Sequence, residues 1–339
     1  RTETTFSLTG IDVGETRYYQ VSVEDVWGLQ SNSNIKIGSS VDGFYKIYNI
    51  GSENEFGNSV QPTLDGGYII TGSTQSISSG NYDVFLYKTN SDGLLEWTKY
   101  FGDSYDDYGK SVIESSDGGY VLVGHTRSYS NQEDIWLIKT DSDGNELWNK
   151  KFGGEREDEG YSLIESSDGG IVLTGHTYSY GGQYSDIWII KTDMDGNTLW
   201  TSTIGIGVSS GGESISQTSD GGFIITGWTG WGNVEDICLV KTNSEGEEEW
   251  IKTFGEDGSG FGHSVQQTSD GGYIILGSLL IKTDSDGNEL WSRNQSGFSI
   301  QETTDGGYIC INNILSKLDS DGNINWEKSH ETQGYHVRQ

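Results

Sequence analysis

The sequence repeats one unit of about fifty residues six times, and this periodicity constrains the fold more than any other feature. Each copy contains a D-G-G-Y-I-I-x-G segment, a polar connection and a D-I-W-L-I-K-T-D-S-D-G-N-E-L-W segment. A unit of this length cannot bury its apolar face alone, so the copies must stack into a propeller or a solenoid. The D-G-G step begins at Asp65, Asp117, Asp168, Asp220, Asp270 and Asp305, and the second segment ends at Trp97, Trp148, Trp200, Trp250, Trp291 and Trp326.

Within one copy the apolar pattern predicts four strands. In the second copy these are residues 111–115, 120–124, 135–140 and 147–152. The S-D-G-G and D-S-D-G-N connections predict tight turns, because their glycines adopt positive φ at little cost. The predicted fold is therefore all-β: a β-propeller of four-stranded antiparallel blades. The full repeats are expected at about 52–101, 103–152, 154–204, 206–254, 256–293 and 295–330, within a propeller domain of residues 41–339.

The two flanks of the repeats carry partial copies. Residues 331–339 are expected to start a further repeat, and residues 44–51 align with an isolated fourth strand. We expect these ends to form part of a seventh blade, and a six-bladed propeller is the alternative. A blade with an unpaired edge can also pair with another molecule, so self-assembly into fibres by strand sharing is a further hypothesis.

Tryptophans and lysines recur at fixed positions in every copy. We interpret the tryptophans at 97, 148, 200, 250, 291 and 326 as structural residues that pack successive blades together. The lysines are expected to pair with turn carboxylates. Repetition at six equivalent positions favours a structural role, since one active site does not need six copies. The lysines are Lys88, Lys139, Lys191, Lys241, Lys282 and Lys317.

The D-x-D-G-N-x-L-W turn resembles the corresponding turn of quinoprotein-type propellers, whose tryptophans dock successive blades. From Phe44 onwards, the D-G-G-Y-I-I-T-G repeats resemble those of large secreted prokaryotic proteins that combine propellers with adhesion modules. The resemblance implies a secreted, extracellular or cell-surface location. It does not extend to quinone chemistry, because Cys238 and Cys310 are not adjacent and are expected to be buried free thiols.

Residues 1–40 belong to a different module. The run F-S-L-T-G-I followed by Y-Y-Q-V-S-V-E-D-x-W-G-L resembles the last three strands of a fibronectin type III domain. Half of such a sandwich cannot bury its own face. We therefore expect this partial domain to obtain its remaining strands elsewhere, as part of a longer protein.

The charge balance limits the partners. The chain has 51 acidic and 20 basic residues, a formal net charge of −31, which repels nucleic acid and anionic lipid surfaces. It carries no apolar run long enough to span a membrane, so direct membrane insertion is not expected. The expected partners are other copies of the chain or other surface proteins, with polysaccharide as an alternative.

Binding residues are expected in the connections between second and third strands. These are long in the first four copies, at 74–82, 126–133, 177–185 and 229–235, and shrink to two residues in the last two. Variable loops on a rigid scaffold concentrate binding residues. The aromatic residues there either bind a sugar or protein or cover one another. The candidates are Tyr129, Tyr178, Tyr180, Tyr184, Trp228 and Trp231.

Metal binding and catalysis have weaker signals. No cofactor is expected, and calcium is the one metal considered. The D-x-D-G-N turns are too short for an EF-hand loop and are interpreted as hairpin turns, which leaves the acidic connections that precede each first strand. We expect no enzyme, since no nucleophile elbow, phosphate loop or metal-spaced histidine motif is present. The predicted function is a non-catalytic interaction or structural module; a carbohydrate-binding propeller is the alternative and a glycan-active enzyme the third possibility. The calcium candidates are Asp103, Asp106, Asp107, Glu155, Glu157 and Asp158.

Overall fold

The computed structural model describes residues 56–75, 81–127, 132–230, 235–255, 260–312 and 314–328 in full. The fibronectin-like segment 1–40 and the start of a further repeat at 331–339 lie outside these residues, as do the chain ends from which a partial seventh blade was expected. Strands are assigned there by backbone alone, as β1 (Thr5–Val13), β2 (Thr16–Glu24), β3 (Gln30–Asn32), β4 (Lys36–Ser39), β5 (Tyr45–Tyr48) and β30 (Gly334–Arg338).

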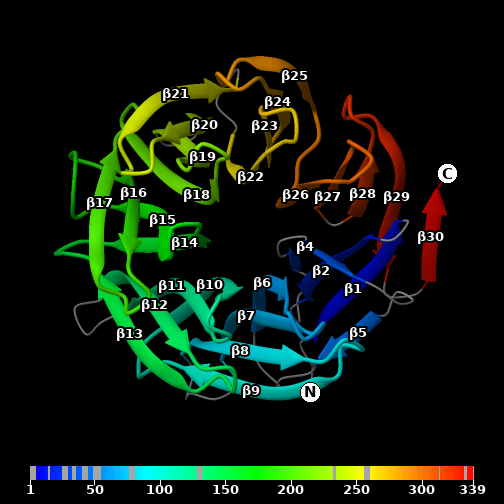
Figure 1. Cartoon of the computed structure of the whole chain (residues 1–339), viewed down its shortest axis with the longest axis horizontal. Helices are drawn as coiled ribbons and strands as arrows, with labels where there is room; N and C mark the ends of the chain where they lie inside the picture. The colour runs from blue at the N-terminus through cyan, green and yellow to red at the C-terminus, as the bar shows by residue number, and fades with distance from the viewer. Residues whose placement is uncertain are drawn as a thin grey trace. The chain divides into compact units, whose positions relative to one another are not determined.

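The chain divides into two compact units, Arg1–Leu163 and Ile164–Gln339. In the first unit, two sheets follow the first two repeats, with their strands in chain order (Figure 1). One sheet is β6 (Glu55–Pro62), β7 (Tyr68–Thr74), β8 (Asp83–Thr89) and β9 (Leu95–Phe101), and the other is β10 (Asp107–Glu114), β11 (Tyr120–Arg127), β12 (Glu133–Thr140) and β13 (Glu146–Phe152).

The remaining repeats give four more sheets with the same antiparallel order, and β30 pairs with the last strand of the sixth. The predicted all-β fold with six four-stranded blades is therefore confirmed. Among the described residues there is no helix, and so none long and apolar enough to cross a membrane. The strands are β14 (Asp158–Ser166), β15 (Gly170–Thr177), β16 (Asp186–Thr192), β17 (Thr198–Ile204), β18 (Ser209–Gln217), β19 (Phe223–Trp231), β20 (Val234–Thr242), β21 (Glu248–Phe254), β22 (Gly262–Gln267), β23 (Tyr273–Gly277), β24 (Leu280–Thr283), β25 (Glu289–Arg293), β26 (Ser299–Glu302), β27 (Tyr308–Ile311), β28 (Ile314–Leu318) and β29 (Ile324–Glu331).

The core lies between neighbouring blades. The second and third strands are buried along almost their whole length, as in β11 and β12, whereas the fourth strand, such as β13, alternates between exposed and half-buried positions. Strands covered on both faces can be apolar throughout, which explains why their sequences are nearly continuous apolar runs rather than alternating ones. In the second unit, Val172 and Ile189 of the third copy share one cluster with Ile225 of the fourth.

Four of the fourth-strand tryptophans pack on the next blade. The ring of Trp97 lies 5.8 Å from that of Tyr120. A Cβ added to Gly144, in the next copy's D-S-D-G-N turn, would stand 2.6 Å from the same indole. Burial of such a ring contributes about 1.5–3 kcal/mol. Equivalent ring pairs are Trp200–Phe223, Trp250–Tyr273 and Trp291–Tyr308.

The recurring lysine of the third strand is buried in every copy and reaches the aspartate of the D-G-G turn. Lys139 Nζ lies 2.5 Å from Asp117 and also donates to the hydroxyl of Ser115. The aspartates are more than half exposed, so each pair joins a buried stem to a solvated turn. The expected pairing of lysines with turn carboxylates is present. The pairs are Lys88–Asp65, Lys139–Asp117, Lys191–Asp168, Lys241–Asp220, Lys282–Asp270 and Lys317–Asp305.

Two strand boundaries differ from the sequence prediction. In the second copy, the first strand begins at Asp107 rather than at residue 111, and it pairs up to Asp107↔Thr126. In the fourth copy, β19 and β20 stay paired as far as Trp231↔Val234, so most of the predicted connection at 229–235 is strand. The sequence prediction places the strand ends where the apolar periodicity ends. Polar residues beyond that point continue the backbone pairing, so the strands are longer than predicted.

Candidate functional site

A β-bulge shapes the start of the first strand. The register of β10 and β11 shifts between Gly109 and Ser111, which places one additional residue in β10. The carbonyl oxygen of Tyr108 then approaches β11 so closely that a Cβ on Gly124 would stand 1.7 Å from it. Glycine is therefore required at this position of the second strand. The same bulge occurs in the first, fourth and fifth copies.

The bulge brings aromatic side chains of the first unit into a continuous series. Ring centroids are 5.7 Å apart for Phe56 and Tyr82, 5.3 Å for Tyr82 and Tyr108, and 5.0 Å for Tyr108 and His125. Tyr161 follows at 6.4 Å from His125. The histidine is buried, and the other four rings are half-buried, so each keeps an accessible part. We refer to these five residues as the first aromatic row.

Charged side chains surround this row. Arg127 pairs with Asp106 at 3.3 Å and with Glu133 at 2.5 Å. Lys110, the residue at the bulge, places its ammonium 5.7 Å from the ring centre of Tyr108 and 5.4 Å from that of Tyr161. Burial raises the pKa of Tyr108 to about 12, and the neighbouring carboxylates, Asp106 first, add to this shift. Carboxylates and cationic side chains therefore both lie next to the row.

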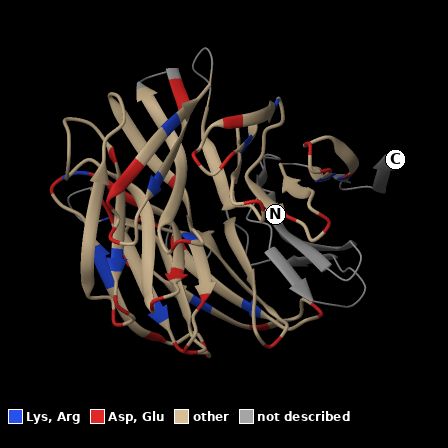
Figure 2. Cartoon of the chain, turned by 45° about the horizontal axis from the view of Figure 1, so that its top comes forward, with Lys and Arg blue, Asp and Glu red and all other residues tan. Residues whose placement is uncertain are grey.

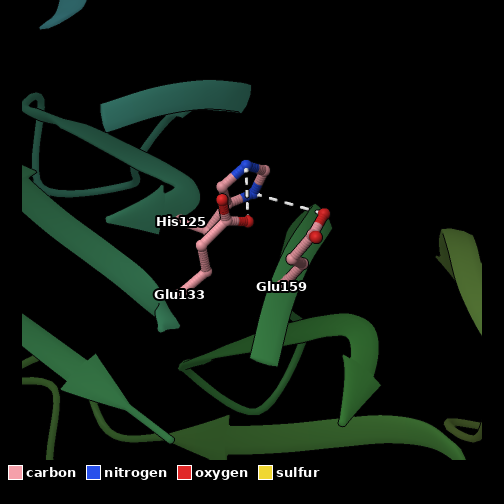
Figure 3. Close-up of side chains that lie close together, drawn as sticks. All are labelled: His125, Glu133 and Glu159. Carbon is pink, nitrogen blue, oxygen red and sulfur yellow. Dashed lines mark ion pairs between the residues drawn. The ribbon is translucent and has the colours of Figure 1, made fainter. Parts of the chain in front are cut away.

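His125 connects two carboxylates (Figure 3). Its Nε2 lies 3.6 Å from Glu133 Oε2, and its Nδ1 lies 3.7 Å from Glu159 Oε2. One ligand atom from each residue can be chosen so that all lie within 4.8 Å of one another. Burial, followed by the nearby charge of Glu159, raises the pKa of Glu133 although Arg127 opposes the shift.

The second unit has a row of its own. Trp228 and Phe261 have ring centroids 6.1 Å apart, Phe261 stacks on His263 at 6.0 Å, and His263 lies 5.4 Å from Phe298. Phe298 is 41% exposed, and the other three rings are half-buried. We refer to these four residues as the second aromatic row.

The aromatic residues proposed from the sequence do not form one site. Trp228 belongs to the second row. Tyr178 stands edge-on to His176 at 5.6 Å, while Tyr180, 44% exposed, lies 5.0 Å from Trp188 and covers it. Tyr184 is half-buried. Tyr129 and the side chain of Trp231 lie outside the described residues.

The row residues Phe56, Tyr108 and Phe261 were missed by the sequence analysis, which looked for binding residues only in the variable connections. Each precedes the first-strand glycine after which the register shifts. An aromatic residue recurring at that position was the available signal.

The acidic calcium candidates have local roles. Asp107 and Asp158 are 1% and 0% exposed, and each accepts a backbone N–H four residues earlier, from Asp103 at 3.0 Å and Gly154 at 2.9 Å. Burial raises the pKa of Asp107 to about 6. Asp106 pairs with Arg127, as described above. Asp103, Glu155 and Glu157 are exposed.

The D-x-D-G-N turns use their first aspartate as a hydrogen-bond acceptor. Asp141 accepts the backbone N–H groups of Asp143 and Asn145 at 3.0 and 2.8 Å, and also the Asn145 amide at 2.9 Å. The Asn145 side chain, followed by its backbone N–H, lowers the pKa of Asp141. These bonds are those of an Asx-type hairpin turn.

A cavity of about 520 Å³ lies beside the tight turns of the second unit and is lined by serine, threonine and glutamine side chains. Gln217 accepts the backbone N–H of Ser167 at 2.8 Å, and Gln267 accepts that of Ser219 at 2.7 Å. Because these glutamines already connect successive blades, we assign the cavity to blade packing.

No family model and no curated protein matches the sequence. Among solved structures, the WD40 domain of Pan2 from Neurospora crassa aligns with TM-score 0.56 and 8% identity, covering 82% of this chain and 80% of that chain. Sqt1 from Chaetomium thermophilum, bound to the N-terminus of ribosomal protein L10, aligns with TM-score 0.53 and 10% identity over 97% and 88% of the two chains. An ulvan lyase aligns with TM-score 0.53 and 11% identity over 97% and 93%. At these identities the similarity shows the propeller fold alone.

Proposed function

We propose that this propeller is a non-catalytic binding module and that its first aromatic row binds a cationic segment of a protein partner. The observation that carries the proposal is the row itself, in which the half-buried Tyr82 and Tyr108 lie near the carboxylates of Asp106 and Glu133, and Glu159 lies beside His125.

This combination suits arginine and lysine side chains. A guanidinium or ammonium is attracted to an aromatic face by about 0.5–2 kcal/mol, and a neighbouring carboxylate adds a charge-assisted hydrogen bond. Lys110 of the chain itself already lies over the rings of Tyr108 and Tyr161. These ring faces therefore accept an ammonium group, and an arginine of a partner could take its place.

The charge of the whole molecule supports the same partner class. The formal net charge is −31, and acidic side chains are spread over the turns and connections of the described residues (Figure 2). Such a surface accelerates association with basic segments in a salt-dependent way. Sqt1, a structural neighbour, is bound to the N-terminus of a ribosomal protein, which is consistent with peptide capture by a propeller.

The test uses four peptides of equal length, rich in arginine, lysine, serine or aspartate, titrated into the chain at low and high salt. The arginine peptide is expected to bind best, and Tyr108→Ala to weaken it about tenfold, as expected for losing one cation–π contact. Tyr100→Ala is the matched control, because Tyr100 is an exposed tyrosine, 39% accessible, on the fourth strand β9. Equal affinity in the wild type and Tyr108→Ala would contradict the proposal.

The second row favours a second candidate, polysaccharide binding. Trp228, Phe261 and Phe298 are partly accessible members of one row, in which His263 lies between the two phenylalanines. Flat aromatic faces stack on sugar rings. An ulvan lyase is among the structural neighbours. Binding of a neutral polysaccharide that is lost in Trp228→Ala, but not in the exposed-residue control Leu199→Ala, would support this function. No binding across a glycan panel would remove it.

A further inference from the structure

Three positions vary among the four copies that have a long connection between the second and third strands. Only in the second copy do all three carry metal-ligating side chains. The positions are the residue after the second-strand glycine, the residue before the third-strand aspartate, and the residue before the first-strand glycine of the next copy. The second copy supplies His125, Glu133 and Glu159 there. The other long-loop copies supply Ser73, Tyr82 and Tyr108; His176, Ser185 and Gly211; and Trp228, Glu235 and Phe261.

His125, Glu133 and Glu159 depart from the repeat, whereas the residues that build the blade recur from copy to copy. A buried histidine between two carboxylates is not needed to build a blade, since the neighbouring copies form without it. His125 is 5% exposed and Glu133 is 9% exposed, so both side chains were removed from water at a cost in free energy. Glu159 is 21% exposed and leaves the cluster open to solvent on its side.

The spacing fits a small cation. Only one imidazole nitrogen can bind a given ion. Nε2 lies 3.6 Å from Glu133 Oε2 and Nδ1 lies 3.7 Å from Glu159 Oε2, so either nitrogen has one carboxylate oxygen at a suitable distance. Two ligand atoms at about 2.1 Å from a tetrahedral Zn²⁺ are about 3.4 Å apart. The ligand atoms of the three residues already lie within 4.8 Å of one another, and a rotation of the partly exposed Glu159 side chain would bring them onto one ion.

Two further side chains hold the carboxylates in place. Arg127 donates to Glu133 Oε1, which leaves Oε2 directed at His125. The hydroxyl of Tyr161 donates to Glu159 Oε2. Outer hydrogen bonds of this kind orient the ligands of protein metal sites.

We propose that His125, Glu133 and Glu159 form a binding site for a divalent transition-metal ion of the Zn²⁺ class. Two carboxylates match the charge of such an ion, and an imidazole nitrogen selects it over Ca²⁺ and Mg²⁺, which prefer sets of oxygen ligands. Three protein ligands leave a fourth position for water or a partner's side chain.

The test is titration of Zn²⁺ into the full chain by calorimetry, with excess Mg²⁺ present to occupy surface carboxylates. We expect one saturable Zn²⁺ site per chain that Mg²⁺ does not displace. His125→Ala should abolish it and Glu159→Gln should weaken it at least tenfold. His176→Ala is the matched control, because the positions equivalent to Glu133 and Glu159 are Ser185 and Gly211 for this histidine.

Co²⁺ absorption provides a second readout, since a nitrogen- and oxygen-ligated ion of low coordination number has characteristic visible bands that surface-bound Co²⁺ lacks. Circular dichroism checks that His125→Ala is folded. If it is not, Glu159→Gln supplies an independent variant at a partly exposed position. The proposal is overturned if the wild type shows no saturable Zn²⁺ binding, if Mg²⁺ displaces the ion, or if both variants bind as the wild type does.

Discussion

Replacing Gly124 with alanine tests how the bulge builds the first aromatic row. The new Cβ would stand 1.7 Å from the carbonyl oxygen of Tyr108, whereas real Cβ contacts stay beyond 3.0 Å. Relief therefore requires the two backbones to separate by 3.0 − 1.7 = 1.3 Å. An N–H···O bond of about 2.9 Å lengthened by that amount is broken.

The expected cost follows from these distances. Loss of about two ladder hydrogen bonds costs roughly 2 kcal/mol, and forced overpacking adds about 1–3 kcal/mol. We therefore expect Gly124→Ala to lower the free energy of unfolding by about 3–5 kcal/mol and to weaken the binding of the arginine peptide, because Tyr108 would move.

The assay is urea unfolding followed by tryptophan fluorescence. Gly182→Ala is the matched control, because its Cβ would meet Asp186 Oδ2 at an ordinary 3.5 Å, and we expect a change within about 0.5 kcal/mol. Gly277→Ala, with a Cβ 1.8 Å from the Phe261 carbonyl, should behave as Gly124→Ala does. If both behave like the control, the bulge does not constrain the second strand and the reasoning is refuted.

Three other predictions concern the repeated contacts. Trp97→Ala should cost about 2 kcal/mol of stability, less than a fully buried tryptophan, whereas the exposed Leu147→Ala should cost little; thermal melts compare them. Lys139→Met should cost about 1 kcal/mol, because methionine keeps the buried stem but leaves Asp117 without its ammonium; Lys150→Met on the outer strand is the control, and equal melting temperatures would count against the pair. The pKa values of Asp220, Asp270 and Asp305 fall from 3.8 to about 2. At Asp220 and Asp270 burial opposes this fall, but hydrogen bonds from a threonine hydroxyl and a lysine outweigh it. At Asp305 the hydrogen bond from the Thr303 hydroxyl is the largest cause. Because the folded pKa is the lower one, this stabilisation is complete above about pH 4 and is lost as the pH falls through about 2; melts over that range should show it, and Asp305→Asn should flatten the dependence.

The fold was predictable because its signals are local and repeated. Apolar second and third strands, glycine turns and one tryptophan per copy each point to the same blade, and the six sheets follow the six repeats. The lysine pairs were also predictable, since a buried lysine needs a partner and each copy offers one turn aspartate at the same spacing.

The candidate site was harder to predict because it depends on contacts between copies. Glu159 lies in the copy that follows His125, and no periodic pattern within one copy connects them. The bulge that directs Tyr108 is marked in the sequence by a glycine and, in three copies, by the aromatic residue before it, and glycines also occur in every turn. An alignment of the copies, searched for positions that depart from the repeat, would have found His125, Glu133 and Glu159.

We propose the first aromatic row as the surface that binds a partner. The most direct measurement is photo-crosslinking of an arginine peptide to the full chain, followed by mass spectrometry of the crosslinked residues. We predict crosslinks at the start of β10 and the end of β11, around Tyr108 and Arg127. Crosslinks confined to the fourth strands β9 and β13, or spread evenly over the acidic turns, would contradict the claim.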